Sequence, residues 1–146
     1  MATFSRNVTV NWEGSIMDGA GQAKAGSGAF TLPVSFPRRI GDAQGVTSPE
    51  ELIAAAHAAC YAMALNATVG RKGGQIAKTD VTATVTADKG DSGITITTSK
   101  LSVTAHGLTG IPKEQFADVA KQAEAGCPVS NALRGALQIQ LDAKAV

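Results

Sequence analysis

Cys60 and Cys127 are the two cysteines of this 146-residue chain, and they are the side chains best suited to redox chemistry. A chain of this length buries about two-thirds of its unfolded surface without the help of disulfides. The cysteines are therefore not needed to hold the fold together. In a reducing cytosol such a pair is more often catalytic, redox-sensing or metal-binding than structural.

The two cysteines occupy contrasting sequence environments. Cys60 lies within the mostly apolar run 52–65, whereas Cys127 directly precedes Pro128 at the start of a short helical pattern. Burial among apolar side chains raises a thiol pKa, and the partial positive charge at a helix start lowers it. Local electrostatics alone therefore favour Cys127 as the nucleophile.

A cation close to Cys60 would reverse that order, because a guanidinium favours the thiolate strongly in a dry site. Arg38 and Arg39 lie in residues 37–46, a polar stretch that we interpret as a loop before the helix of Cys60. A carboxylate that accepts the planar arginine fork would hold such a side chain in place. Glu50 is a plausible partner.

A metal site is the second chemistry to weigh. His57 and His106 could join the two cysteines in a zinc site with two nitrogen and two sulfur ligands. The spacing lacks a second tight pair of ligands, so we expect no metal and no cofactor. His57 is then expected to be a packed or hydrogen-bonded helix residue.

Composition narrows the choice of partners. The net charge is +1, and 13 basic and 12 acidic residues are spread along the chain, which gives no basic stripe for nucleic acid and no membrane patch. Charged residues make up 17%, a low share that favours a homo-oligomer. The first residues lack the pattern of a secretory signal, and the apolar run 52–65 is shorter than a membrane span, so we expect a cytoplasmic protein.

The first half of the chain reads as strands followed by a helix. Glycines interrupt short Val, Thr and Trp stretches in residues 7–35, a pattern typical of an antiparallel meander. Ser48 as N-cap, Pro49 at the first helical position and Glu51 as the end of a capping box predict a helix start. Glu50 is not required for this capping. The helix that follows, through residue 65, is apolar on every face, so we expect it to be buried on every side. We expect a second subunit to bury part of it.

The second half mixes both element types. Residues 81–86, 94–96 and 101–105 are expected to form two or three half-buried antiparallel strands. A helix begins at Pro112 and ends at Gly126 as a C′ glycine, and another follows Cys127. Residues 137–141 alternate again and form a last strand. Trp12 and Phe116 are expected in the core. The order of elements predicts an α+β fold in one domain, residues 1–146.

Two segments make the chain recognisable. Residues 47–61, TSPEELIAAAHAACY, resemble the central helix of the OsmC/Ohr organic hydroperoxide reductases, and residues 125–130, AGCPVS, resemble their second motif. Trp12-Glu13-Gly14 is similar to the opening strand of that family. Val129 and His57 resemble the OsmC branch more than the Ohr branch.

The resemblance implies a thiol-dependent peroxidase that reduces organic hydroperoxides in oxidative or osmotic stress defence. It implies that Cys60 is the peroxidatic cysteine and Cys127 the resolving one, assisted by Arg39 and Glu50; the neighbouring Arg38 leaves the choice of arginine open. A dithiol, such as a lipoyl-bearing protein, would reopen the Cys60–Cys127 disulfide. The implied fold is an intertwined homodimer whose antiparallel sheets wrap central helices. The alternative is a non-enzymatic redox sensor or ligand-binding protein.

Overall fold

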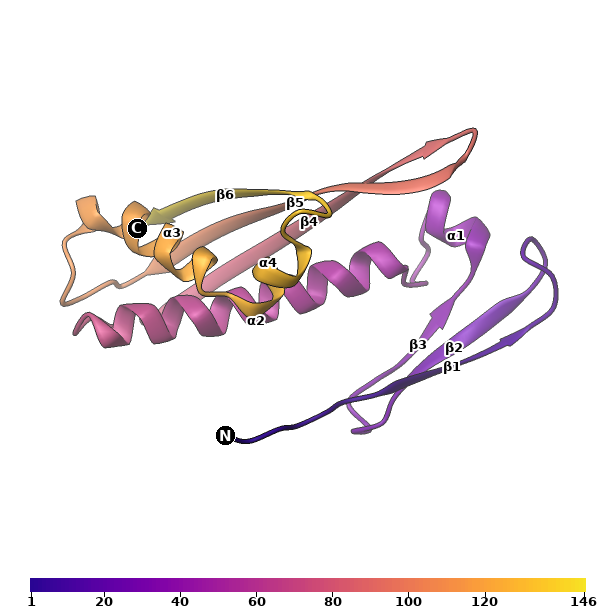
Figure 1. Cartoon of the computed structure of the whole chain (residues 1–146), viewed down its shortest axis with the longest axis horizontal. Helices are drawn as coiled ribbons and strands as arrows, with labels where there is room; N and C mark the ends of the chain where they lie inside the picture. The colour runs from indigo at the N-terminus through magenta and orange to yellow at the C-terminus, as the bar shows by residue number, and fades with distance from the viewer. The chain divides into compact units, whose positions relative to one another are not determined.

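The computed structural model describes residues 1–146, whose contacts divide into two compact units, Met1–Pro49 and Glu50–Val146. The first unit is a three-stranded antiparallel sheet in the order β1-β2-β3, which confirms the predicted meander (Figure 1). Its strands are β1 (Val8–Glu13), β2 (Ala20–Ala25) and β3 (Thr31–Val34). Gly14 leaves β1 with a φ of +89°, a left-handed conformation that costs glycine little and other residues more.

The two predictions made for the loop and for Trp12 need correction. Residues Phe36–Ile40 form a short helix, α1, where a loop was expected. Pro37 stands in its first turn, where a fixed φ is already helical, but five residues are too few to show a helical period in the sequence. Trp12 was expected in the core but is 38% exposed in this chain. It belongs to β1, whose residues are all exposed.

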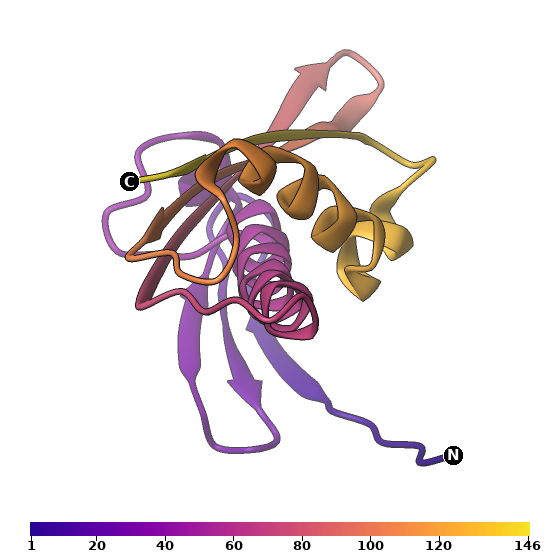
Figure 2. The same ribbon diagram turned by 90° about the vertical axis from the view of Figure 1, so that its left-hand side faces the viewer.

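The second unit is a sheet in the order β4-β5-β6 with helices on one face (Figures 1 and 2). β4 and β5 are antiparallel, and a register shift between Thr86 and Ala87 marks a bulge. β6 runs parallel to β5. The strands are β4 (Lys78–Gly90), β5 (Gly93–His106) and β6 (Gln138–Ala145), and the helices are α2 (Pro49–Arg71), the 3₁₀ turn η1 (Lys113–Gln115), α3 (Phe116–Ala125) and α4 (Pro128–Leu133).

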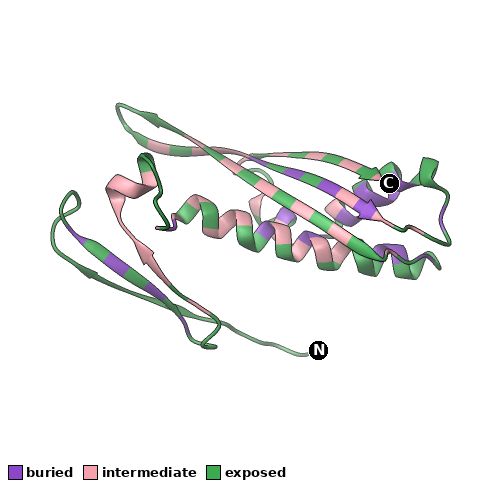
Figure 3. Cartoon of the chain, turned by 180° about the vertical axis from the view of Figure 1, so that it is seen from behind, coloured by how far each residue is buried: buried purple, intermediate pink, exposed green.

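Alternating side chains of the sheet build one side of the core of this unit. Exposed residues alternate with buried or half-buried ones along the three strands (Figure 3). The core joins residues of α2, β5 and α3: Tyr61, Leu65, Val69, Leu101, Val103, Ala105, Phe116, Val119, Ala120 and Ala123. Phe116 is therefore a core residue, as predicted. Period-two strands and a helical stripe meet here, which is how an α+β unit buries its apolar faces.

Helix α2 begins at Pro49, as predicted, but extends to Arg71 instead of ending near residue 65. Five of its residues are buried: His57, Tyr61, Leu65, Thr68 and Val69. By length and hydropathy alone it could cross a membrane, a test that the central helix of a soluble protein also passes. At the end of α3, Gly126 has a φ of −94°, so it is not the left-handed C′ glycine that was expected.

Candidate functional site

Both cysteines are free thiols in the second unit, and their settings differ. Cys60 lies half-buried on α2. Cys127 is fully buried and occupies the N-cap position of α4, where its Sγ accepts a hydrogen bond from the backbone N–H of Ser130 at 3.5 Å. Pro128 at the first position starts α4 with its φ already set.

The two thiols lie close enough to interact. Burial raises the pKa of the Cys60 thiol, a backbone hydrogen bond at Val129 opposes this, and the hydrogen bond and charge of Cys127 raise the pKa further. The contacts of this unit therefore hold Cys60 as a thiol, in agreement with the sequence argument. Ionisation at neutral pH requires a positive group that lowers the pKa again.

An apolar cavity of about 360 Å³ opens at Cys60. Its α2 residues are spaced by the helical repeat, because Ala64, Ala67 and Arg71 follow Cys60 at distances of one, two and three turns. We call this side of α2 the groove face, made of Cys60, Met63, Ala64, Ala67 and Arg71. It offers apolar contact surface next to a thiol.

Arg71 is the groove residue that the sequence analysis missed. Its guanidinium donates a hydrogen bond to Thr68 Oγ1 at 3.0 Å. The signal that could have found it is its place three helical turns after Cys60, but the helix was expected to end before residue 71.

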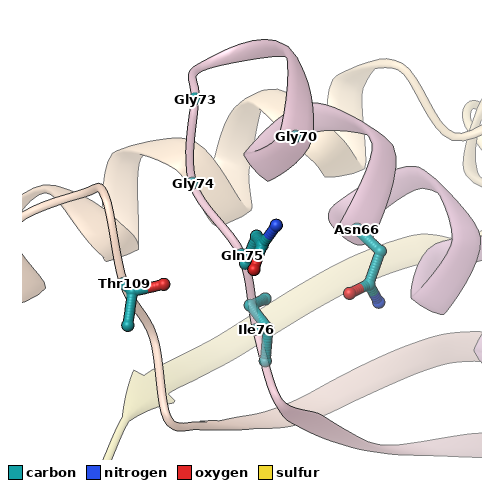
Figure 4. Close-up of a pocket in the computed structure, with 7 residues that line it drawn as sticks. All are labelled: Asn66, Gly70, Gly73, Gly74, Gln75, Ile76 and Thr109. Carbon is teal, nitrogen blue, oxygen red and sulfur yellow. The ribbon is translucent and has the colours of Figure 1, made fainter.

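A larger cavity, about 540 Å³, lies at the C-terminal end of α2 (Figure 4). Asn66, Gln75 and Thr109 present polar side chains around it, and glycines form much of the rest. No cysteine and no ionisable side chain lines it. Of the two cavities, only the smaller one is lined by a cysteine, Cys60.

His57 is fully buried and bonded on both sides of its ring. Nδ1 lies 2.7 Å from Ser99 Oγ of β5, and Nε2 lies 2.8 Å from Ser130 Oγ of α4. Burial lowers the pKa of His57, with a smaller opposing effect of Glu124, so the imidazole is neutral near pH 7. No group of three or more His, Cys, Asp and Glu side chains that could hold a metal ion is present.

The two remaining predicted site residues belong to different units, Arg39 to the first and Glu50 to the second. Arg39 belongs to α1 and is half-buried, and Glu50 stands in the first turn of α2. Arg38 Nη1 donates to the backbone oxygen of Asp42 at 3.2 Å. The neighbour of Arg39 therefore has a local partner at the end of α1.

The sequence matches the family described as OsmC-like protein over residues 41–142. The chain belongs to the OsmC family. It is 37% identical to peroxiredoxin OsmC of Escherichia coli over 143 residues, which cover 97% of this chain and 99% of that protein. The resemblance inferred from the two cysteine motifs is confirmed.

Solved structures give the same result for the fold. The crystal structure of the organic hydroperoxide resistance protein OhrB of Bacillus subtilis matches with a TM-score of 0.77 and 26% identity, over 98% of this OsmC-family chain and 100% of that chain. A protein of the same description from Elizabethkingia anophelis matches with a TM-score of 0.78 and 25% identity, over 99% of each chain. The predicted α+β fold of the OsmC/Ohr type is confirmed.

Proposed function

We propose that this chain is a thiol-dependent peroxidase that reduces organic hydroperoxides to alcohols. The observation that carries the proposal is that Cys60 lines an apolar cavity and its thiol also contacts the buried thiol of Cys127. The names of its relatives, peroxiredoxin OsmC and organic hydroperoxide resistance protein, describe the same class of activity. Its role would be defence against oxidative or osmotic stress.

In the first step the Cys60 thiolate attacks the distal oxygen of the hydroperoxide. The O–O bond breaks, the sulfur is oxidised to sulfenic acid, and the alkoxide leaves and takes up a proton as the alcohol. Since burial and Cys127 raise the pKa of Cys60, the step needs a cation to stabilise the thiolate. We assign this role to Arg39, held by Glu50, as the family resemblance implies, with the neighbouring Arg38 as the alternative.

In the second step Cys127 resolves the sulfenic acid. Its thiolate attacks the sulfur of Cys60, the S–O bond breaks, and the leaving hydroxide takes up the proton of Cys127 as water. The resulting disulfide is reduced by thiol exchange with an external dithiol, such as a lipoyl-bearing protein. No metal and no cofactor take part in either step.

The walls of the cavity favour alkyl or lipid hydroperoxides over hydrogen peroxide. Met63, Ala64 and Ala67 offer apolar contacts that an alkyl group gains and hydrogen peroxide does not. The expected preference lies in kcat/KM, because that parameter includes the binding of the alkyl group.

The working form is proposed to be an intertwined homodimer in the cytoplasm, each chain acting as one domain. Met63 of α2 is 73% exposed in this chain, and β1 exposes Val8 and Val10 at 52% and 54%. Apolar residues this exposed on a mostly apolar helix and a strand favour cover by a second copy.

Turnover separates the peroxidase from the alternative, a redox sensor that is oxidised once. We expect repeated consumption of cumene hydroperoxide with dithiothreitol as reductant, and no turnover in Cys60→Ser. The assay follows peroxide loss at a large excess over protein. Loss of a single equivalent of peroxide, followed by no further reaction, would support the sensor instead.

The variant Cys127→Ser tests the resolving role. Without a second thiol, the sulfenic acid at Cys60 is expected to accumulate and to react with dimedone, detected as a mass increase of the intact protein. Wild-type protein treated alike should show the disulfide. An unlabelled variant that has consumed one equivalent of peroxide would contradict the assignment.

A further inference from the structure

The proposed chemistry leaves one buried polar cluster unused: His57 with Ser99 and Ser130. All three residues are 0% exposed, and they come from α2, β5 and α4. Burying polar side chains costs free energy unless each is hydrogen-bonded, and an apolar side chain at position 57 would avoid that cost. No buried polar side-chain atom is left without a hydrogen bond. A buried polar network that is satisfied throughout indicates a role for these residues beyond filling the core.

Ser130 connects this cluster to the resolving cysteine. Its hydroxyl lies 2.8 Å from His57 Nε2, and its backbone N–H donates to Cys127 Sγ at 3.5 Å. One residue thus faces the imidazole with its side chain and the thiol with its main chain. A shift of Ser130 would move the donor that meets the sulfur.

His57 also lies on the same helix as Cys60, three residues before it. Residues three apart on a helix are neighbours on its surface. Helix α2 therefore carries the peroxidatic thiol directly and holds the turn of the resolving thiol through the His57–Ser130 hydrogen bond. The distance between the two sulfurs is therefore set by helix α2 and by the contacts of Ser130 with His57 and with Cys127.

We propose that His57 is a positioning residue, which holds Cys127 against Cys60 through Ser130 for closure of the disulfide. The inference rests on the proposed peroxidase function and adds a role for a residue that touches neither the peroxide nor the reacting sulfurs. Closure forms the S–S bond, breaks the S–O bond of the sulfenic acid and releases water. Holding both sulfurs in contact raises the rate of such a step, because few other conformations compete with the reactive one.

The asymmetry of the ring gives a sharp test. An asparagine places its amide near the position of Nδ1, toward Ser99, and a glutamine places its amide near Nε2, toward Ser130. We expect His57→Asn to slow closure about tenfold, the effect of losing one buried hydrogen bond. His57→Gln should close near the wild-type rate. Ser130→Ala, which removes only the hydroxyl, should match His57→Asn.

Ser99→Ala is the matched control, since it deletes the hydroxyl on the far side of the same ring. It should lose stability as Ser130→Ala does and still close near the wild-type rate. Each reduced protein is mixed with one equivalent of cumene hydroperoxide and quenched with dimedone at successive times. Mass spectrometry then gives the rate of sulfenic acid formation and the rate of closure separately.

Equal closure rates in Ser99→Ala and Ser130→Ala would overturn the proposal, because the network would then act only through general packing. Wild-type rates in both His57→Asn and Ser130→Ala would overturn it as well. If His57→Asn does not fold, Ser130→Ala against Ser99→Ala decides alone. Failure of the proposed function is a separate result, in which the wild-type protein itself forms no Cys60–Cys127 disulfide.

Discussion

Helix α2 shows two faces that differ in what their residues do. On one, which we call the core face, His57, Tyr61 and Leu65 follow one another at intervals of one turn and are 0% exposed. Tyr61 donates its hydroxyl to the backbone oxygen of Ala120 at 3.0 Å, and His57 bonds to two serines. The groove face offers small or flexible apolar side chains instead, together with a thiol and a guanidinium.

The difference suggests that the core face keeps α2 fixed so that the groove face can remain open. Residues that lock a helix to a sheet and to two neighbouring helices also fix where Cys60 stands. Small side chains such as Ala64 and Ala67 leave room for a ligand without contributing much to the core. Changes to the core face should therefore act mainly on stability, and changes to the groove face on catalysis. His57 is the exception, because its bond to Ser130 is also proposed to position Cys127.

The largest expected effect is on stability, from Leu65→Ala. Removing a fully buried leucine leaves a cavity and costs about 2–5 kcal/mol of unfolding free energy, measured by urea denaturation. Met63→Ala is the control, since that side chain is 73% exposed in one chain and should cost far less. A loss at Met63 as large as that at Leu65 would mean that the proposed homodimer buries Met63 as completely as a single chain buries Leu65, and would break the comparison.

Much of this fold could be predicted from the sequence. The start of α2 follows from Pro49, a local signal, and the long strands follow from alternation, which depends only on neighbouring residues. The end of α2 at Arg71 could not be placed, because its last turns lack a clear apolar pattern. The short α1 carries too few residues to show a period, and the parallel pairing of β5 with β6 depends on tertiary contacts.

The site was predictable in a different way. Cys60 and Cys127 were identified by type and by resemblance, and nothing local predicts that residues so far apart in the chain come into contact. The same is true of His57, whose partners lie 42 and 73 residues further along the chain. Serines in a strand and a short helix give no signal of their own. Only the tertiary packing brings Ser99 and Ser130 next to the imidazole of His57.

A smaller effect is expected from Ala67→Asp on the groove face. A carboxylate in the apolar cavity should lower kcat/KM for cumene hydroperoxide about tenfold, because an alkyl group no longer displaces water favourably there. The same variant should lose less activity toward hydrogen peroxide, because the effect of the new charge on the Cys60 thiolate acts on both peroxides and the lost alkyl contact acts on only one. Ala67→Val keeps the wall apolar and should keep the preference. An equal loss for both peroxides would place the alkyl group elsewhere.

The smallest effect concerns the pH dependence of stability on the core face. Burial lowers the pKa of His57 below the ordinary value of 6.5, and Glu124 of α3 is the charged group that opposes this. The unfolded chain thus takes up a proton that the folded chain does not, so stability should fall as pH drops below about 6.5.

Urea denaturation at about pH 5 and about pH 7.5 measures this slope. His57→Gln, which keeps a polar group toward Ser130 but does not titrate, should lose less stability between the two pH values than the wild type. His106→Gln is the control, because it removes the exposed histidine that bonds to Asp80 at 2.8 Å and leaves His57 in place. If all three proteins show the same slope, the imidazole on the core face carries its charge in the folded state, and the network with Ser99 and Ser130 must accommodate a cation.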